Sequence, residues 1–296
     1  MTTRVRERAL AIVNPAAGNG AGDRAAIRLA AELGKADLAV EIVRTPAPGE
    51  AARIARQAAD DGYPTVIAVG GDGTANEIAN GLLGTETALA LFPVGSGNDF
   101  ARALGYPRRR RHLVKFLASA RRRVIDVGDA NGRVFVNAVG IGIDGHVAER
   151  IVASERIVGA RLGYLVGSLV SIVEYSPQPM RIRIDGATRE GNHLVVVAAN
   201  GTHFGGGMHV APKAEQDDGL LDIVVAGDLG KWASIVALAK LYRGTHVDGQ
   251  RVLAFRAREL EVDLDRALPM ETDGEPSRAQ HLEVRIRPKA LTVLAR

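Results

Sequence analysis

The sequence predicts an α/β protein with an N-terminal, doubly wound α/β domain and a C-terminal, mainly antiparallel β-sandwich domain. Two observations carry this prediction. Over residues 1–125, short apolar runs alternate with segments of helical periodicity, which is typical of a parallel sheet covered by helices. In residues 126–296, most apolar runs alternate with a period of two, as antiparallel strands do. We therefore expect one domain in each of these ranges.

The alternation in the first domain can be followed segment by segment. Strands are predicted for the short apolar runs "ALAIVNP", "LAVEIVRT", "TVIAVG" and "ALALFPVG". The third run is apolar throughout, as in a strand that is covered on both faces. Helices are predicted for "GDRAAIRLAAELGK", "EAARIARQAADDG" and "ANEIANGLLG", and the first of these is expected to end near Gly34.

The second domain is expected to begin within "RRRVIDVGDANG". Its predicted strands are "VFVNAVGIGI", "MRIRID", "HLVVVAAN", "LLDIVVAG", "ELEVDLD" and "LEVRIRP". Two helical stretches interrupt them, at residues 148–174 and 231–241. This order of elements favours an antiparallel domain rather than a second parallel one.

Composition excludes several classes of protein. The 296 residues include no cysteine, so disulfides, thiol nucleophiles and thiolate metal sites are excluded. The 38 Lys and Arg against 34 Asp and Glu give a net charge of +4, too weak to imply a nucleic-acid partner. The most apolar helical stretch, "LGYLVGSLVSIVEY", is shorter than the ~20 residues that span a bilayer. With no signal-peptide pattern at the start, we expect a cytoplasmic protein; the sequence leaves its oligomeric state open.

The segment "GGDGTANE" follows a predicted buried strand and precedes a predicted helix. Its glycines, Gly70, Gly71 and Gly73, would expose backbone N–H groups to phosphate oxygens at the carboxyl end of a parallel strand. Asp72 would repel phosphate, so it is expected to bind a metal ion or to position a hydroxyl. The structural alternative is a Gly-Asp turn. We expect Glu77, one turn into the helix, to be structural.

Two further glycine-rich loops follow neighbouring strands, and together the three loops favour a phosphate-binding site. They are "NPAAGNG" at residues 14–20 and "FPVGSGNDFARALG" at residues 92–105. The other nucleotide-binding motifs are missing. Neither G-x-x-x-x-G-K-[ST] nor a helix-opening G-x-G-x-x-G occurs, which argues against a P-loop enzyme and a hydride-transfer cofactor.

Six segments in this order resemble the diacylglycerol kinase catalytic family, which includes soluble bacterial lipid kinases and is similar to sphingosine and ceramide kinases. They are "IVNPAAG", "GGDGTANE", "PVGSGNDFA", "NAVGIGID", "GGGMHVAPKAEQDDGLLD" and "TDGEP". The resemblance implies ATP- and Mg²⁺-dependent phosphorylation of a lipid alcohol such as diacylglycerol. It also implies an N-terminal nucleotide-binding domain, a C-terminal lipid-substrate domain and an active site in the interdomain cleft.

The same resemblance implies roles for residues of the first domain. The nucleotide would be lined by Asn14, Pro15, Ala16, Ala17 and Gly18, with Thr45 near the adenosine. The phosphates would be held by Gly70, Gly71, Asp72, Gly73, Thr74, Ala75 and Asn76, and by Ser96, Gly97 and Asn98. Ser96 stands where the family usually has threonine and keeps the hydroxyl. Asp99 and Asp72 would place the catalytic magnesium ion.

In the second domain, "TDGEP" supplies Asp273 and Glu275, which the resemblance makes catalytic. Glu275 would be the general base on the lipid hydroxyl. Without the family pattern, this segment is better read as a hairpin turn. In "APKAEQDDGLLD", the resemblance implies a structural Mg²⁺ held by the Asp218 side chain, the carbonyls of Glu215 and Leu220, and water. The alternative is a solvated acidic turn.

The basic run at residues 107–123 is the main charge asymmetry of the chain. Its arginines, at residues 108–111 and 121–123, bracket an apolar helical stretch. They either keep a surface helix soluble or dock on anionic lipid headgroups, with a gain of about 1 kcal/mol for each nearby basic residue. Two other functions stay open: an NAD kinase, which shares "GGDGT", and a lipid- or nucleotide-binding protein without catalysis.

Overall fold

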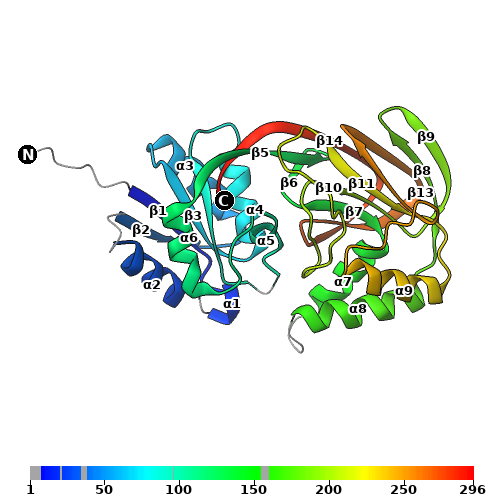
Figure 1. Ribbon diagram of the computed structural model, residues 1–296, viewed down its shortest axis with the longest axis horizontal. Coiled ribbons are helices and arrows are strands. Elements are labelled where there is room, and N and C mark those ends of the chain that lie inside the picture. Colours follow the sequence, from blue (N-terminus) through cyan, green and yellow to red (C-terminus); the bar gives the residue numbers. More distant parts are fainter. Residues whose placement is uncertain (1–7, 21, 35–38, 96, 155–159) are drawn as a thin grey trace, which may run out of the picture. The chain divides into compact units, whose positions relative to one another are not determined.

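The structure, a computed structural model, describes residues 8–20, 22–34, 39–95, 97–154 and 160–296 (Figure 1). The chain forms two compact units. Unit 1 comprises Met1–Ile125 together with Lys289–Arg296, and unit 2 comprises Asp126–Pro288. The last residues of the chain, which the sequence assigns to the second domain, thus lie in unit 1. The chain passes from one unit to the other within two strands, β5 (Arg121–Ala130) and β14 (Glu275–Ala295).

Unit 1 is a parallel sheet flanked by helices, as the sequence predicts. The sheet order is β2–β1–β3–β4, and every neighbouring pair is parallel. Its elements are β1 (Arg8–Val13), α1 (Ala17–Gly20), α2 (Gly22–Gly34), β2 (Ala39–Arg44), α3 (Glu50–Asp60), β3 (Thr65–Gly70), α4 (Asp72–Leu82), β4 (Ala88–Pro93), α5 (Asp99–Ala103), η1 (Arg110–His112) and α6 (Leu113–Ser119).

Helices cover both faces of this sheet, with α2 and α3 on opposite sides in Figure 1. Ile12 and Ile67 on the strands are fully buried, as are Leu29 of α2 and Ile78 of α4. This explains why β3 is apolar and buried after Thr65: neither face of this part of the strand meets water. The end of β14 adds a parallel neighbour to β4, where Val293 pairs with Leu89.

Unit 2 is built on antiparallel strands, with the order β12–β11–β10–β7–β13–β14 and with β8 and β9 continuing from β13. Its strands are β6 (Arg133–Phe135), β7 (Ala138–Gly142), β8 (Gln178–Ile184), β9 (Ala187–His193), β10 (Val195–Ala199), β11 (Leu221–Ala226), β12 (Val252–Ala257) and β13 (Glu259–Thr272). The predicted fold class is therefore confirmed in both units.

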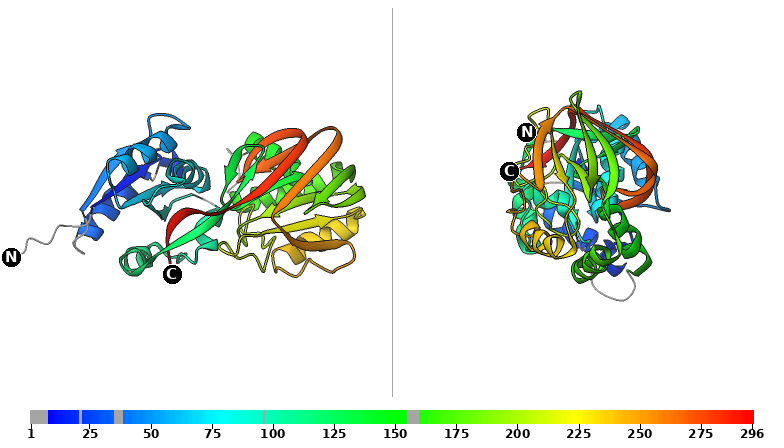
Figure 2. Two further views of the ribbon diagram at one scale, coloured as in Figure 1. Left: turned by 90° about the horizontal axis from the view of Figure 1, so that it is seen from above. Right: turned by 90° about the vertical axis from the view of Figure 1, so that its right-hand side faces the viewer.

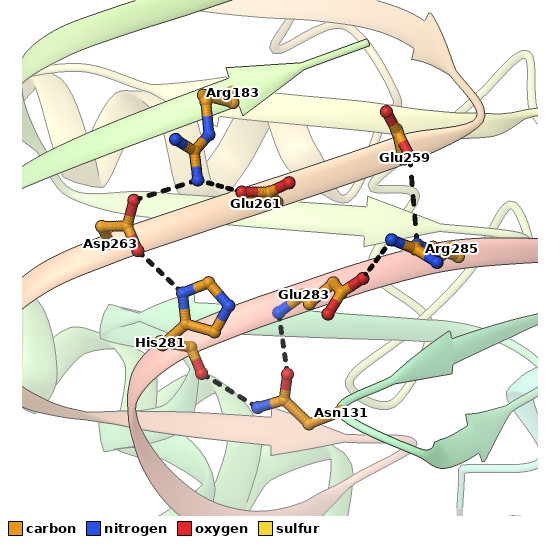
Figure 3. Close-up of polar contacts among 8 residues, drawn as sticks. All are labelled: Asn131, Arg183, Glu259, Glu261, Asp263, His281, Glu283 and Arg285. Atoms are coloured by element: carbon orange, nitrogen blue, oxygen red, sulfur yellow. Dashed lines mark hydrogen bonds and ion pairs between the residues drawn. The ribbon is translucent and has the colours of Figure 1, made fainter. Parts of the chain in front are cut away.

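The two faces of the β13–β14 hairpin differ sharply. The inward face contributes to the core of unit 2 with Leu260, Val262, Leu282 and Val284. The outward face carries the polar contacts of Figure 3. There Arg183 pairs with Glu261 and lies 3.5 Å from Asp263, and His281 Nδ1 lies 2.7 Å from the other oxygen of Asp263. The Asn131 side chain donates to the His281 carbonyl at 2.9 Å. This alternation fixes the register, because a slip by one residue would exchange the two faces.

Three helices lie against the strands of unit 2: α7 (Ile143–Ser154), α8 (Ala160–Glu174) and α9 (Lys231–Leu241). Figures 1 and 2 show α8 and α9 side by side. The prediction for α9 is confirmed. The helical stretch predicted at residues 148–174 is confirmed over residues 148–154 of α7 and over all of α8, although α7 begins earlier, at Ile143; residues 155–159 lie outside the described part. Among the described helices, none is both long and apolar enough to cross a membrane.

Candidate active site

Parallel pairing brings the carboxyl ends of four strands to one edge of unit 1. Asn14, directly after β1, donates from Nδ2 to Thr74 Oγ1 at 3.2 Å. Thr45, directly after β2, donates its backbone N–H to the Val13 carbonyl at 2.9 Å. The structure thus brings Asn14, Thr45 and Thr74 together, as expected of residues that follow neighbouring parallel strands.

The loop after β1 turns tightly around Asn14. Its side-chain oxygen accepts the Ala16 N–H at 3.0 Å, and its carbonyl accepts the Ala17 N–H at 3.1 Å. Pro15 lies within this turn, and Gly18 has a positive φ of 60°, a left-handed conformation that glycine adopts at no steric cost. The predicted nucleotide-lining residues therefore form one turn at the sheet edge.

The glycines of "GGDG" and "GSGND" meet backbone to backbone. A Cβ built on Gly95 would lie only 2.6 Å from the Cα of Gly71, so the protein's own packing requires glycine there. Gly70 is equally constrained, because its Cβ would lie 2.5 Å from the Thr74 side chain. Gly73 differs: an added Cβ would meet no described atom within 4 Å. Of these four glycines, Gly73 is the one left with open space, in which a phosphate could approach.

Two carboxylates turn toward the same point in this edge. Asp72 Oδ1 accepts the N–H of Phe100 at 3.1 Å, and Asp99 pairs with Arg102. A Cβ built on Gly97 would lie 2.9 Å from Asp72 Oδ2 and 3.8 Å from Asp99 Oδ2. The glycine at this position therefore leaves a space that both carboxylates face.

Burial raises the pKa of Asp72, while hydrogen bonds from the backbone N–H groups of Phe100, Asp99 and Asn98 and the charge of Arg102 oppose the shift. A cation placed between the carboxylates would favour the ionised form further. Asp72 also has a structural task, since it anchors the loop after β4 to the start of α4.

The remaining predicted residues of this edge support the loops rather than project from them. Asn98, in the left-handed region with φ 53°, donates to the Gly95 carbonyl at 2.7 Å. Asn76 is buried and accepts from Asn80 Nδ2 at 2.9 Å, and Ala75 is buried beside it. Ser96 lies outside the described residues.

Glu77 is structural, as predicted. Its Oε2 accepts the backbone N–H of Ala51 at 3.2 Å, at the first turn of α3. The N-cap residue of that helix, Gly49, has no side chain to make such a bond. A carboxylate at a helix N-terminus also interacts favourably with the helix dipole.

In unit 2, the predicted catalytic segment is a two-residue hairpin turn between β13 and β14. Asp273 and Gly274 both have positive φ, and Thr272 pairs with Glu275 across the turn. The Asp273 carboxylate accepts the N–H groups of Val136, Asn137 and Ala138 at 2.7, 2.9 and 3.0 Å.

The two carboxylates of this hairpin thus have different surroundings. Asp273 is fixed by three amides and ties the hairpin to the start of β7; a catalytic role for it stays a prediction. Glu275 is half exposed and pairs with Arg133. Of the two, Glu275 is the one with a side chain open to a substrate.

The acidic loop before β11 is bonded to a residue of β5 that the sequence did not single out. Asp126 is fully buried, its Oδ2 accepts the N–H of Gly219 at 2.7 Å, and its own N–H donates to the Gln216 carbonyl at 2.6 Å. Asp126 was missed because it lies in "RRRVIDVG", the segment interpreted as the domain boundary. An acid that directly follows two apolar residues could have indicated a buried carboxylate there. Asp218, the predicted metal ligand, pairs with Arg256 instead.

The structural Mg²⁺ predicted at this loop would use the Asp218 side chain, the carbonyls of Glu215 and Leu220, and water. Within the described ranges, no group of three or more His, Asp or Glu side chains is placed to hold a metal ion. Burial and the charge of Glu215 raise the pKa of nearby Asp222 to about 6. A guanidinium already neutralises this loop, and a structural Mg²⁺ there stays a prediction.

Unit 2 also contains an apolar cavity of about 130 Å³ that sequence reasoning missed. Its walls come from α7, α8 and α9 and from β10 and β11, with Val147, Ile172, Val197 and Leu238 among them. These residues are far apart in sequence, and no local pattern distinguishes them from ordinary core positions. An apolar cavity of this size, close to the ~150 Å³ that can hold a benzene ring, accommodates a short length of hydrocarbon.

Two acids, Asp144 and Glu271, line this apolar cavity. Asp144 lies in the first turn of α7, and burial raises its pKa to about 7, opposed by a hydrogen bond from the Gly145 N–H. Its Oδ2 is buried and has no hydrogen-bond partner in the described part of the chain. The segment "NAVGIGID" had indicated an acid here, but not that it would face a cavity.

Glycine-rich loops at the edge of a parallel sheet, followed by an antiparallel unit, define a two-domain phosphotransferase. Two family models agree with this class. Residues 8–130 match the diacylglycerol kinase catalytic domain, and residues 137–295 match the YegS C-terminal NAD kinase beta sandwich-like domain.

Proteins that are similar over most of the chain indicate the family more closely. A "Probable lipid kinase YegS-like" from Pseudomonas aeruginosa is 34% identical over 91% of this chain and 88% of its own length. A "Diacylglycerol kinase" from Bacillus subtilis is 28% identical over 91% and 90%. The crystal structure of a diacylglycerol kinase from Bacillus anthracis matches 99% of this chain and 98% of its own, with 26% identity and a TM-score of 0.77. The chain belongs to the diacylglycerol kinase catalytic domain family, a membership that implies the use of ATP.

Proposed function

We propose that this protein is an ATP- and Mg²⁺-dependent lipid kinase. It would transfer the γ-phosphoryl group of ATP to the hydroxyl of diacylglycerol or a related lipid alcohol and give phosphatidic acid or the analogous phospholipid. The observation that carries the lipid substrate is the apolar cavity of unit 2, because its walls suit hydrocarbon and not the charged, polar surface of a nucleotide such as NAD.

On the ATP side, the backbone of unit 1 does most of the binding. The N–H groups in the first turn of α4, which begins at Asp72, would hold phosphate oxygens near the open space at Gly73. The turn around Asn14 and the neighbouring Thr45 would line the nucleoside. Phosphoryl transfer needs positioning and charge stabilisation more than covalent chemistry, and fixed backbone donors supply both.

Asp72 and Asp99 fit a magnesium ion, because two carboxylate oxygens face one space that no side chain fills. Mg²⁺ is usually held by one or two carboxylates together with phosphates and water, so the small number of protein ligands is no obstacle. When bound, the ion would neutralise charge on the transferred phosphoryl group. At the loop of residues 215–220, Asp218 is paired with Arg256, a structural Mg²⁺ stays a prediction, and we assign no step to an ion there.

On the lipid side, Glu275 would accept the proton of the attacking hydroxyl. An alcohol is a weak nucleophile, and a carboxylate within hydrogen-bond reach removes its proton as the new P–O bond forms. Arg133 orients this carboxylate through their ion pair, and Asp273 fixes the hairpin that carries it. An acyl chain of the substrate would enter the apolar cavity.

The experiment that tests this proposal is phosphoryl transfer from radiolabelled ATP to a panel of lipid alcohols, with NAD in a parallel reaction. We expect a labelled phospholipid from dioctanoylglycerol, or from another member of the panel, and none from NAD. Transfer to NAD alone would indicate a nucleotide kinase. Binding of lipid without any transfer would indicate a non-catalytic protein.

A further inference from the structure

The helices α8 and α9 expose an unusual amount of apolar side chain. Of the eleven large hydrophobic residues that are exposed in the described part of the chain, seven lie on these two helices. They are Leu165, Val166, Leu169 and Val173 on α8, and Trp232, Ile235 and Val236 on α9. Scattered exposed apolar residues are ordinary, but a group concentrated on two neighbouring helices marks an interaction surface.

The exposed residues form one stripe on each helix, opposite the stripe that packs inward. On α9, Trp232 and Val236 are four residues apart and share the outer face, while Ser234 and Leu238 face the apolar cavity. On α8, Val173 lies on the outer stripe and is 69% exposed. Each helix is thus apolar on two sides, which neither solubility nor the fold of unit 2 requires.

The charge around this surface favours an anionic partner. From Lys231 to Val247 the chain carries Lys231, Lys240 and Arg243 and no acidic residue. Lys240 and Arg243 are exposed at the end of α9. Trp232, 77% exposed at the other end of the helix, is a side chain that prefers the boundary between hydrocarbon and polar headgroups.

We propose that the exposed face of α8 and α9, hereafter the α8–α9 face, docks this protein on the surface of an anionic phospholipid bilayer. The helices would lie in the plane of the interface, with the apolar stripe among the acyl chains and the basic residues at the headgroups. This inference rests on the proposed lipid kinase function, for which it supplies the route of the substrate. The inward sides of the same two helices line the apolar cavity. A lipid that leaves the bilayer at this face would therefore have only a short path to the cavity.

The chain carries its own probe for this proposal, because Trp232 is its one tryptophan. The wild-type protein should show a blue-shifted emission with vesicles of phosphatidylcholine and phosphatidylglycerol, and quenching when the acyl chains carry bromine. Vesicles of phosphatidylcholine alone should give a clearly smaller change. Binding to the anionic vesicles with unchanged emission and no quenching would overturn the proposal.

The variant Leu169→Gln/Val173→Gln/Val236→Gln tests the surface without removing the probe. We expect at least tenfold weaker sedimentation with anionic vesicles and a similar loss of turnover on vesicle-embedded diacylglycerol. Turnover on dispersed dioctanoylglycerol should stay within twofold of wild type, which would also exclude misfolding. The matched control is Ile27→Gln, an equally exposed apolar residue on α2 of unit 1, and it should bind vesicles normally.

The alternatives give different results. If a variant with Arg108, Arg109 and Arg111 changed to Glu loses vesicle binding while the α8–α9 variant keeps it, the basic run is the docking surface and this proposal is wrong. If the α8–α9 variant changes the oligomeric state but not vesicle binding, the face joins copies of the chain instead. Failure of the kinase proposal is distinguishable, because wild type would then lack turnover on dispersed lipid whatever its vesicle binding.

Discussion

The proposed phosphate-binding edge of unit 1 and the hairpin and cavity of unit 2 are built on opposite principles. In unit 1, the candidate residues lie in or just after the loops that follow four parallel strands, so the sheet alone gathers them. In unit 2, the hairpin at Asp273 is tied to the start of β7 by contacts that span more than a hundred residues of sequence. A parallel sheet collects functional loops through its topology, whereas an antiparallel unit needs individual long-range bonds.

The two regions also use carboxylates differently. Asp72 has one oxygen bonded to the backbone and the other turned to a space that Gly97 leaves open. Asp273 has both oxygens bonded to the backbone, and Glu275 beside it is half exposed. In the proposed function, Asp72 of unit 1 therefore has both an anchoring and a chemical role, whereas in unit 2 Asp273 anchors the hairpin and Glu275 has the chemical role.

The largest expected effect is at Asp72. Asp72→Ala should abolish phosphoryl transfer, because the change removes both the proposed metal ligand and the acceptor that anchors the loop after β4. Asp72→Asn separates these tasks: it keeps an acceptor for the Phe100 N–H but loses the charge, so it should fold like wild type and still be inactive. The measurements are radiolabelled-ATP turnover and thermal unfolding. Substantial activity in the Asn variant would refute the metal role.

Glu275→Gln should lower kcat by about 10²–10⁴-fold, the range typical of a lost general base, and change ATP binding little. The amide can still contact Arg133, so the hairpin should keep its geometry. The matched control is Glu283→Gln on the same strand, whose side chain pairs with Arg285 at 2.6 Å and should be silent in catalysis. If ATP binding collapses while kcat holds, Glu275 serves the nucleotide instead and the division between the units breaks down.

Substitution of Asp144 tests whether burying this carboxyl group at the cavity lowers the free energy of unfolding. Its folded pKa of about 7 lies above the ordinary value of 3.8, so between these pH values the folded state keeps a proton that the unfolded chain has lost. Stability from this group is therefore fully present below about pH 4 and is lost as the pH rises to about 7. Since one pKa unit is worth ~1.4 kcal/mol, the loss reaches several kcal/mol.

Asp144→Asn should remove that loss, so that urea denaturation at pH 8 gives a higher free energy of unfolding than wild type. At pH 4 the two proteins should differ little. Equal pH dependence of the two proteins would mean that Asp144 is not held protonated in the cavity.

The sequence predicted what is local and missed what is not. The strand–helix alternation of unit 1 and the helix α9 could be predicted because apolar periodicity is a local pattern. The strand β9 could not, because all but the last of its seven residues are exposed and its conformation comes only from pairing with β8. The end of β14 was missed because Pro288 suggested a stop, yet the chain continues through Lys289, which has a positive φ of 51°, to Ala295.

The same distinction holds for the candidate site. Motifs located the loops of unit 1, and the parallel sheet then brought them together without further information. Asp126 was missed because only the folded chain places it against Gly219, and the cavity was missed because its walls come from helices and strands distant in sequence. The ion pair between Arg256 and Asp218 could not be predicted from the sequence, because the two residues lie on different elements and no local pattern links them.

The smallest expected effects, and the finest comparison, come from two glycines of the phosphate-binding edge. Gly95→Ala should destabilise the protein by about 1–3 kcal/mol, because the new methyl group would press on the backbone of Gly71.

Gly73→Ala should leave stability unchanged or raise it by up to ~1 kcal/mol, since its Cβ meets no described atom and the residue lies in α4. Yet Gly73→Ala should raise the KM for ATP several-fold, because the methyl group would occupy the space proposed for phosphate. Thermal unfolding and the KM for ATP check both. An unchanged KM in Gly73→Ala would mean that the open space at this glycine is not where phosphate approaches, and that the glycines of this edge serve the contact between the two loops alone.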